Sequence, residues 1–149
     1  PLITRLGDAG IIWIILTVLL LIIPKTRKTG VIMMAALLVD VLLCNVLIKN
    51  LVARTRPFDV NTAVQLLIEK PQDYSFPSGH TAASVTALYL AGEKKMWKAA
   101  LVLAVLIALS RLYLYVHYPT DIIGGVIFGS LSGYLGYKIV EWIQKKKIK

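Results

Sequence analysis

Stretches of apolar residues alternate with short polar or charged stretches along this chain. Five apolar segments stand out, at about residues 9–23, 30–48, 81–92, 99–116 and 122–143. A helix needs about 20 residues to cross the hydrocarbon core of a bilayer, within a range of about 17–25. The second, fourth and fifth segments reach that length, whereas the first reaches it only from Leu2 and the third only from Ser78. The pattern therefore predicts an all-α integral membrane bundle with five visible spanning helices.

The length of the chain leaves room for about one domain, so we expect residues 1–149 to form a single membrane-embedded domain. The chain begins with Pro1 rather than Met, so we expect further residues upstream, with room for a sixth span. Residues 50–77 form the one long connection between apolar segments. Loops longer than about 12–15 residues are often functional, which directs attention to this loop.

The composition agrees with a membrane protein. Hydrophobic residues make up 57% of the 149 residues and charged residues 17%, whereas soluble domains are about 45–50% apolar and about 25% charged. Intrinsic disorder is excluded because it needs low hydrophobicity, and a soluble enzyme of this size could not bury so much apolar surface. The single cysteine, Cys44, excludes an intrachain disulfide framework and a cysteine metal cluster.

The net charge of +9 is distributed in a way that predicts topology. Eleven of the 17 basic residues form three clusters that five crossings place on one side: Lys25, Arg27 and Lys28; Lys94, Lys95 and Lys98; and Lys138, Lys145, Lys146, Lys147 and Lys149. We take this side as cytoplasmic, because short cytoplasmic loops are enriched in Lys and Arg. The expected protein is a multi-pass protein of the cell membrane whose long loop faces outward. Basic residues spread over membrane boundaries indicate contact with the bilayer rather than with nucleic acid.

Polar clusters lie at the outward ends of the apolar segments. The first, residues 49–57, carries Lys49 and Arg56 seven positions apart, which is about two turns of a helix and places both cations on one face. The second, residues 77–80 with the sequence PSGH, opens the third segment. The N-terminus of a helix attracts anions, and Gly79 allows a ligand to approach the backbone closely.

The third cluster, residues 110–121, adds Arg111, so that three fixed cations face one point and call for a strongly anionic ligand. A phosphate monoester, with a charge of about −1.5 to −2 near neutral pH, is such a ligand. Asp121 follows His117 by four residues and can hold one imidazole nitrogen while the other attacks. With His80, the chain then has the nucleophile and the proton donor that phosphoryl transfer requires.

The three clusters together resemble the signature of the type 2 phosphatidic acid phosphatase superfamily. The matching residues are Lys49-x6-Arg56-Pro57, Pro77-Ser78-Gly79-His80 and Ser110-Arg111-x5-His117-x3-Asp121. This superfamily includes integral-membrane lipid phosphatases, soluble bacterial acid phosphatases and vanadium haloperoxidases. Its membrane members usually have one more spanning helix than is visible here.

The resemblance implies a role for each matching position. It implies that His117 is the nucleophile, that Asp121 orients it and that His80 protonates the leaving oxygen. The phosphate-binding residues that it implies are Lys49, Arg56, Ser78, Gly79 and Arg111. It implies no metal ion or other cofactor, and the single carboxylate of the constellation is too few for a magnesium site.

We therefore interpret the chain as a metal-independent lipid phosphatase that hydrolyses a lipid phosphate or diphosphate at the outer face through a phosphohistidine. By analogy with the family, undecaprenyl diphosphate is the first choice of substrate, and phosphatidylglycerophosphate and phosphatidic acid are alternatives. A phosphotransferase is a third option. A non-catalytic lipid-binding or transport protein is the rival from another class, although such a protein would be free to lose His117 or Asp121. A vanadate-dependent peroxidase is disfavoured by the hydropathy. The sequence does not indicate an oligomeric state.

Features outside the motifs carry separate expectations. Arg54 could join the site, but it lies two residues from Arg56 and points off that helical face, so we favour contact with solvent or lipid headgroups over this alternative. Asp40, in the middle of the second apolar segment, is expected to make hydrogen bonds between helices. A face of small residues that lets another helix approach closely is predicted at Gly125, Gly129 and Gly133.

Overall fold

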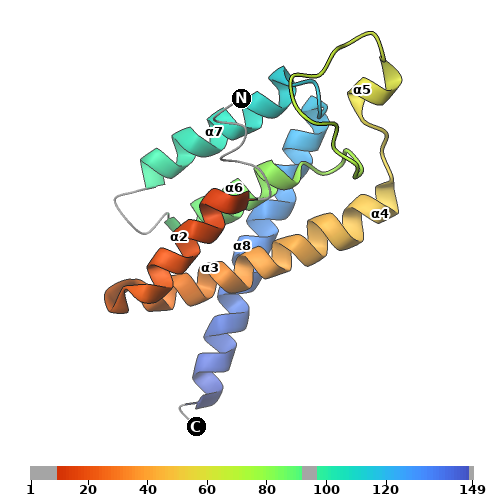
Figure 1. Ribbon diagram of the computed structural model, residues 1–149. Helices are drawn as coiled ribbons and strands as arrows, with labels where there is room; N and C mark the ends of the chain where they lie inside the picture. Colours follow the sequence, from red (N-terminus) through yellow and green to blue (C-terminus); the bar gives the residue numbers. More distant parts are fainter. Residues whose placement is uncertain (1–9, 92–96, 148–149) are drawn as a thin grey trace.

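The computed structural model describes residues 10–91 and 97–147, and the regular secondary structure of this part of the chain is helical, without strands (Figure 1). Its main helices are α2 (Ile11–Ile22), α3 (Arg27–Asp40), α6 (Gly79–Ala91), α7 (Trp97–Tyr113) and α8 (Pro119–Lys147). Its shorter elements are the 3₁₀ turn η2 (Pro24–Thr26), the π-helix η3 (Val41–Ile48), α4 (Lys49–Val52) and α5 (Pro57–Val60). Each of the five predicted apolar segments therefore falls on helical structure.

Length and composition distinguish two helical stretches of the described residues as candidates for crossing a membrane. They are Pro24–Val60 and Pro119–Lys146. The other three predicted spans fall on shorter helices, because α2, α6 and α7 have 12, 13 and 17 residues. Residues 1–9, where we expected the first span to begin, lie outside the described part of the chain.

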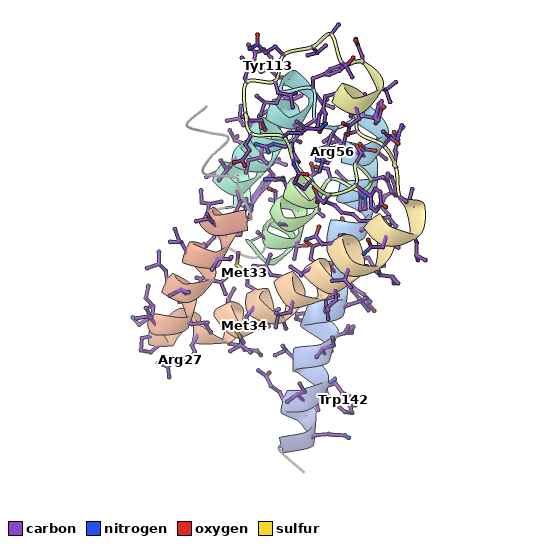
Figure 2. All side chains as sticks on the ribbon, turned by 45° about the vertical axis from the view of Figure 1, so that its right-hand side comes forward. Arg27, Met33, Met34, Arg56, Tyr113 and Trp142 are labelled. Carbon is purple, nitrogen blue, oxygen red and sulfur yellow. The ribbon has the colours of Figure 1, made fainter. Side chains whose placement is uncertain are left out.

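Local sequence explains where several helices begin and end. Pro24 comes two residues after the last residue of α2, and it ends the helix because proline lacks the N–H that a continuing helix needs. α4 ends where Ala53 adopts the left-handed conformation, with φ of 47°. Pro57 begins α5 and Pro119 begins α8, because the fixed φ of proline suits the first turn of a helix. The breaks at Ala53, Pro57 and Pro119 turn the chain at the end of the bundle that carries the long loop, and the break at Pro24 turns it at the opposite end (Figure 2).

Close contacts with α8 hold the bundle together. This helix packs against both α6 and α3, and α6 also packs against α7. A Cβ atom at Gly129 would lie 2.4 Å from the carbonyl oxygen of Ala82, and one at Gly136 would lie 2.4 Å from the Cα atom of Ala36. Gly125 meets α6 in the same way as Gly129. Gly125 and Gly129 of the predicted small-residue face are therefore used for packing inside the bundle, and Gly136 adds a close contact with α3.

Apolar side chains lie both inside the bundle and on its surface. The main core cluster joins four helices through Trp13, Met33, Ala87 and Ile107. Large side chains such as those of Ile22 and Leu42 remain more than half exposed, at 66% and 63%. Soluble monomers rarely expose extensive apolar surface, so this exterior suits a lipid environment. Figure 2 shows Arg27 and Trp142 toward one end of the bundle and Arg56 and Tyr113 toward the other.

The π-helix η3 determines which way Lys49 faces. Asp40 and Lys49 are nine positions apart, which in an uninterrupted α-helix would place them about 180° apart around the axis. Both are nevertheless buried, with 2% and 5% exposed, and both line the same cavity. The wider turns of a π-helix rotate the chain less per residue, and the eight residues of η3 thereby bring Lys49 to the side of Asp40. Such π-turns are frequent at functional sites.

Candidate active site

A cavity of about 310 Å³ brings the three predicted clusters together. Six of the predicted site residues line it: Lys49, Arg56, Gly79, His80, Arg111 and His117. The other two, Ser78 and Asp121, are completely buried, and the backbone N–H of Ser78 donates a hydrogen bond to the carbonyl oxygen of Asp121 at 3.0 Å. Residues that are far apart in the sequence therefore meet at one place, where the long loop joins the helices.

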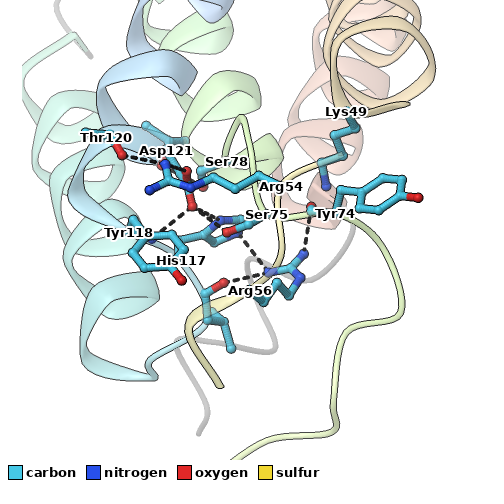
Figure 3. Close-up of polar contacts among 12 residues, drawn as sticks. Lys49, Arg54, Arg56, Tyr74, Ser75, Ser78, His117, Tyr118, Thr120 and Asp121 are labelled. Carbon is cyan, nitrogen blue, oxygen red and sulfur yellow. Dashed lines mark hydrogen bonds and ion pairs between the residues drawn. The ribbon is translucent and has the colours of Figure 1, made fainter. Parts of the chain in front are cut away.

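His117 lies in the turn between α7 and α8, between a carboxylate and a guanidinium group (Figure 3). Its Nδ1 is 3.4 Å from Oδ2 of Asp121, and its Nε2 is 3.4 Å from Nη1 of Arg56. Both distances exceed the range of about 2.7–3.2 Å of ordinary N–H···O hydrogen bonds. Asp121 thus faces the imidazole on its Nδ1 side, without a short hydrogen bond to it.

The carboxylate of Asp121 obtains its shorter contacts from other groups. Oδ2 accepts hydrogen bonds from the backbone N–H of Tyr118 at 2.9 Å and from the hydroxyl of Ser75. Oδ1 accepts one from Nη1 of Arg54 at 2.7 Å. A buried carboxylate needs such partners, because an uncompensated buried charge is strongly destabilising. Ser75 and Arg54 both belong to the long loop region, so their hydrogen bonds to Asp121 connect this region to the first turn of α8.

Arg54 contradicts our expectation that it contacts solvent or lipid headgroups. Its guanidinium pairs with Asp121, donates a hydrogen bond to the hydroxyl of Thr120 at 2.6 Å and stacks over the ring of Tyr118 at 4.0 Å (Figure 3). Arg54 belongs to none of the three motifs, and these contacts agree with the less favoured alternative, in which it joins the site.

The reason for this error is the end of helix α4. The helix stops before Ala53, whose left-handed conformation turns the chain, and Arg56 is extended with φ of −77° and ψ of 155°. Helical periodicity therefore does not apply to Arg54 or Arg56. Lys49 and Arg56 both reach the cavity as predicted, but from two separate segments rather than from one helical face.

Arg56 is buried beneath the long loop and is joined to Asp73. Its Nε donates to the carbonyl oxygen of Asp73 at 2.7 Å, its Nη2 to the carboxylate Oδ1 of Asp73 at 2.6 Å and its Nη1 to the carbonyl oxygen of Val116 at 2.7 Å. The other carboxylate oxygen of Asp73 pairs with Nζ of Lys49. Sequence analysis missed Asp73, and the only signal that pointed to it was the unusual length of the loop.

Burial and neighbouring charges set the ionisation of two groups outside the helices. Burial alone would raise the pKa of Asp73, but the hydrogen bonds and charges of Lys49 and Arg56 outweigh it and hold the pKa below its ordinary value. Burial lowers the pKa of His117, although the long hydrogen bond with the carboxylate of Asp121 acts in the opposite direction. Near neutral pH, Asp73 is therefore negatively charged, and His117 is neutral with one ring nitrogen that carries a lone pair.

His80 occupies the first turn of α6 beside another buried cation. Its Nε2 lies 3.4 Å from Nη1 of Arg111, which comes from the last turn of α7. The preceding residue, Gly79, lies against η3, where an added Cβ would come within 2.8 Å of Oδ1 of Asn45. Glycine therefore lets the N-terminus of α6 approach η3 and Lys49 at the same cavity.

The chemistry of the site is that of an anion-binding cavity with two imidazoles. Within residues 10–91 and 97–147, no three His, Cys, Asp or Glu side chains are grouped closely enough to hold a metal ion. Fixed positive groups, here one lysine and two arginines, bind the oxygens of phosphate well, and arginine does so with a planar fork of donors. The arrangement suits binding of a phosphoryl group next to a neutral imidazole.

Comparison with known proteins establishes the family. A family model described as the PAP2 superfamily matches residues 29–145, and the chain belongs to this superfamily. The undecaprenyl-diphosphatase of Sulfolobus acidocaldarius is 38% identical over 140 residues, which are 92% of this chain and 68% of that protein. The decaprenylphosphoryl-5-phosphoribose phosphatase of Mycobacterium tuberculosis is 34% identical over 131 residues, which are 87% of this chain and 72% of that protein.

Solved structures agree with this assignment. The PAP2-type phosphatidylglycerolphosphate phosphatase of Bacillus subtilis has a TM-score of 0.70 and 32% identity, covering 95% of this chain and 74% of that chain. LpxE of Aquifex aeolicus has a TM-score of 0.74 and 29% identity, covering 91% of this chain and 81% of that chain. The family resemblance carried by the three motifs is confirmed, and the protein is a lipid phosphatase of the membrane.

The ion pair between Arg54 and Asp121 leads to a stability prediction. We expect Arg54→Gln to lower the free energy of unfolding by about 1–3 kcal/mol, because it removes a charged donor from a buried carboxylate. The matched control is Lys70→Gln, which breaks the pair of Lys70 with Asp59, 57% and 36% exposed. Loss of such a surface pair costs less than about 1 kcal/mol. Denaturant unfolding in detergent measures the free energy of unfolding of both variants. Equally small losses in the two variants would contradict the proposed contribution of the Arg54–Asp121 pair to stability.

Proposed function

We propose that this protein hydrolyses the diphosphate group of a long-chain polyprenyl lipid, with undecaprenyl diphosphate as the first candidate. The observation that carries the proposal is that both charged and apolar side chains line the cavity. The charged and titratable residues include both histidines with Lys49, Arg56 and Arg111. The apolar residues include Ile14, Leu37, Val41 and Ala83. A lipid phosphate has both a charged headgroup and an apolar chain, which match these two kinds of lining residue.

In the proposed reaction, His117 is the nucleophile. Because Asp121 faces Nδ1, the attacking atom is Nε2, which forms a bond to the terminal phosphorus while the bond from phosphorus to the leaving oxygen breaks. His80 donates a proton to that oxygen. A water molecule then attacks the phosphohistidine and returns a proton to His80. Inorganic phosphate leaves, and both histidines regain their initial protonation states.

The proposed role of the cations is to hold and stabilise the phosphoryl oxygens. We assign this role to the cations Lys49, Arg56 and Arg111, together with the uncharged donors of Ser78 and Gly79. Fixed donors that point to oxygens on which charge develops lower the barrier, because they need no reorganisation during the reaction. We propose that the activity needs no metal ion, since these groups supply the positive charge that a metal ion supplies in many phosphotransferases.

The relatives support a lipid phosphate as substrate and favour a polyprenyl chain. Two of the similar proteins are named for polyprenyl phosphates, an undecaprenyl-diphosphatase and a decaprenylphosphoryl-5-phosphoribose phosphatase. One similar structure is that of a phosphatidylglycerolphosphate phosphatase, so phosphatidylglycerophosphate and phosphatidic acid are the second candidates. The non-catalytic alternative has less support, because His80, His117 and Asp121 are all present and lie at one site.

Phosphate release from a panel of substrates tests this proposal. We expect detergent-purified protein to have its highest kcat/KM with undecaprenyl diphosphate, followed by phosphatidylglycerophosphate, phosphatidic acid and a water-soluble phosphate ester. EDTA should leave the rate unchanged, and His117→Ala should lower it by at least about 10³-fold, as expected for loss of a nucleophile. A higher kcat/KM for phosphatidylglycerophosphate would assign the enzyme to the second candidate. Absence of release from every lipid would favour the non-catalytic alternative.

We further propose that five helical segments of one domain cross the membrane and that the cavity opens on the extracytoplasmic side. Figure 2 places Arg27, the first residue of α3, at the end of the bundle opposite Arg56. Trp142, near the lysines that end α8, lies at the same end as Arg27. Short cytoplasmic loops are rich in Lys and Arg, which supports this orientation. The predicted basic residues Lys94 and Lys95 lie outside the described part of the chain.

Single cysteines test the orientation. In a Cys44→Ser background, Gln65→Cys places a thiol in the long loop and Lys145→Cys places one near the end of α8, both at exposed positions. An impermeant thiol reagent applied to intact cells should label position 65, and position 145 only after the cells are opened. Labelling of position 145 but not of position 65 in intact cells would contradict the proposed orientation.

A further inference from the structure

Asp73 occupies a place that the proposed function assigns to substrate. Its two carboxylate oxygens contact the two buried cations Lys49 and Arg56, one oxygen to each. The side chain of Asp73 is itself 54% exposed, whereas those of Lys49 and Arg56 are 6% and 4% exposed. Asp73 also lines the same cavity as His80 and His117. A carboxylate thus covers the two cations from the solvent side.

The carboxylate of Asp73 is not what keeps Arg56 in position. The guanidinium is also bound by two backbone carbonyl groups, through Nε to Asp73 and through Nη1 to Val116, each at 2.7 Å. These two bonds fix the plane and direction of the guanidinium. Loss of the negative charge at position 73 would leave this anchoring in place. The contact of the carboxylate with Arg56 therefore serves charge pairing rather than placement.

A carboxylate and a phosphoryl group compete for the same donors. Both present oxygens that accept hydrogen bonds from Lys and Arg, and a bound phosphoryl group that uses both cations must displace the carboxylate. Asp73 lies in the loop between α5 and α6, in a segment without helix, and more than half of its side chain is exposed. Rotation of the side chain toward solvent would free the two cations without movement of a helix.

We propose that Asp73 is an internal competitor for the phosphate subsite, and that it keeps the subsite from being occupied by singly charged phosphodiester headgroups. This inference rests on the proposed function, in which Lys49 and Arg56 bind phosphoryl oxygens. Displacement of Asp73 imposes the same cost on every anion that needs both cations. A phosphate monoester carries a charge of about −1.5 to −2 near neutral pH and overcomes that cost. The phosphodiesters of bulk lipids carry one negative charge, no more than the carboxylate itself, and therefore do not overcome the cost of displacing it.

The sign of the effect separates this role from a positioning role. If Asp73 competes with phosphate, its neutralisation tightens anion binding. If Asp73 is instead needed to position Lys49, its neutralisation weakens anion binding. Asp73→Asn keeps the size of the side chain, removes the charge and replaces one accepting oxygen with an NH₂ donor, and Asp73→Glu restores the charge. The matched control is Asp59→Asn. It also removes a negative charge from this region, but Asp59 pairs with the exposed Lys70 rather than with a buried cation.

The experiment measures binding of inorganic phosphate and of dimethyl phosphate, a singly charged phosphodiester, to detergent-purified protein by isothermal titration calorimetry. We expect Asp73→Asn to lower both dissociation constants about tenfold, the size of one modest charge–charge interaction. Asp73→Glu should return them toward the wild-type values, and Asp59→Asn should leave them unchanged. The Asp73→Asn enzyme should also become sensitive to inhibition by phosphatidylglycerol in mixed micelles.

The outcomes distinguish this inference from the proposed function. Dissociation constants that are unchanged or raised in Asp73→Asn, while wild-type protein binds phosphate, would overturn the competitor role alone. Two results would contradict the anion site and with it both proposals. One is phosphate binding to Lys49→Met as tight as to wild type, and the other is the absence of phosphate binding to both wild type and Asp73→Asn. A thermal unfolding midpoint within the experimental error of wild type shows that each variant is folded.

Discussion

Buried positive charge is the constraint on which the rest of this site depends. Lys49, Arg56 and Arg111 are all almost completely enclosed at the end of the bundle. Removal of a charged group from water costs several kcal/mol per ion unless opposite charge or well-placed acceptors compensate it. Asp73 compensates Lys49 and Arg56, and the backbone carbonyls around Arg56 add to that compensation. The same excess of fixed cations is what allows a phosphoryl group to bind there.

The helical packing positions these charges by bringing backbones unusually close together. Gly125 and Gly129 let α8 lie against α6, and Gly79 lets the start of α6 lie against η3. These contacts connect α6, which carries His80, and α8, which follows His117, with η3, which precedes Lys49. The π-helix η3 then supplies the rotation that directs Lys49 into the cavity beside Asp40. Positions far from the cavity therefore determine its geometry as much as the motif residues do.

The sequence predicted those parts of the structure whose signals are local. The lengths of the apolar runs indicated the helical segments, and the motif spacings indicated the eight site residues that the fold brings together. Asp73 was not predicted, and for Arg54 the alternative of joining the site was not the favoured one, because their partners, Asp121 and the pair of cations, are set by the path of the chain after Ala53. The number of membrane crossings cannot be read as directly from helix length, because α6 and α7 are shorter than a typical membrane-spanning helix.

The π-helix is reflected in the spacing of the buried positions along this segment. The buried positions Ala36, Asp40, Cys44 and Lys49 are spaced by four, four and five residues. This mean spacing is longer than the 3.6-residue period of an α-helix, and it matches a segment in which the chain rotates less per residue. Apolar composition alone concealed the pattern, because almost all positions of this segment are apolar on every face.

Identification of the phosphorylated residue tests the central claim, that His117 carries the phosphoryl group, most directly. Protein mixed with a ³²P-labelled lipid phosphate and quenched in alkali, in which phosphohistidine survives, is digested, and the labelled peptide is sequenced by mass spectrometry. The account predicts label on His117 in wild type and none in His117→Ala. In His80→Ala it predicts label that persists on His117 when the leaving group needs no proton. Label on His80, or on a carboxylate, would contradict the account.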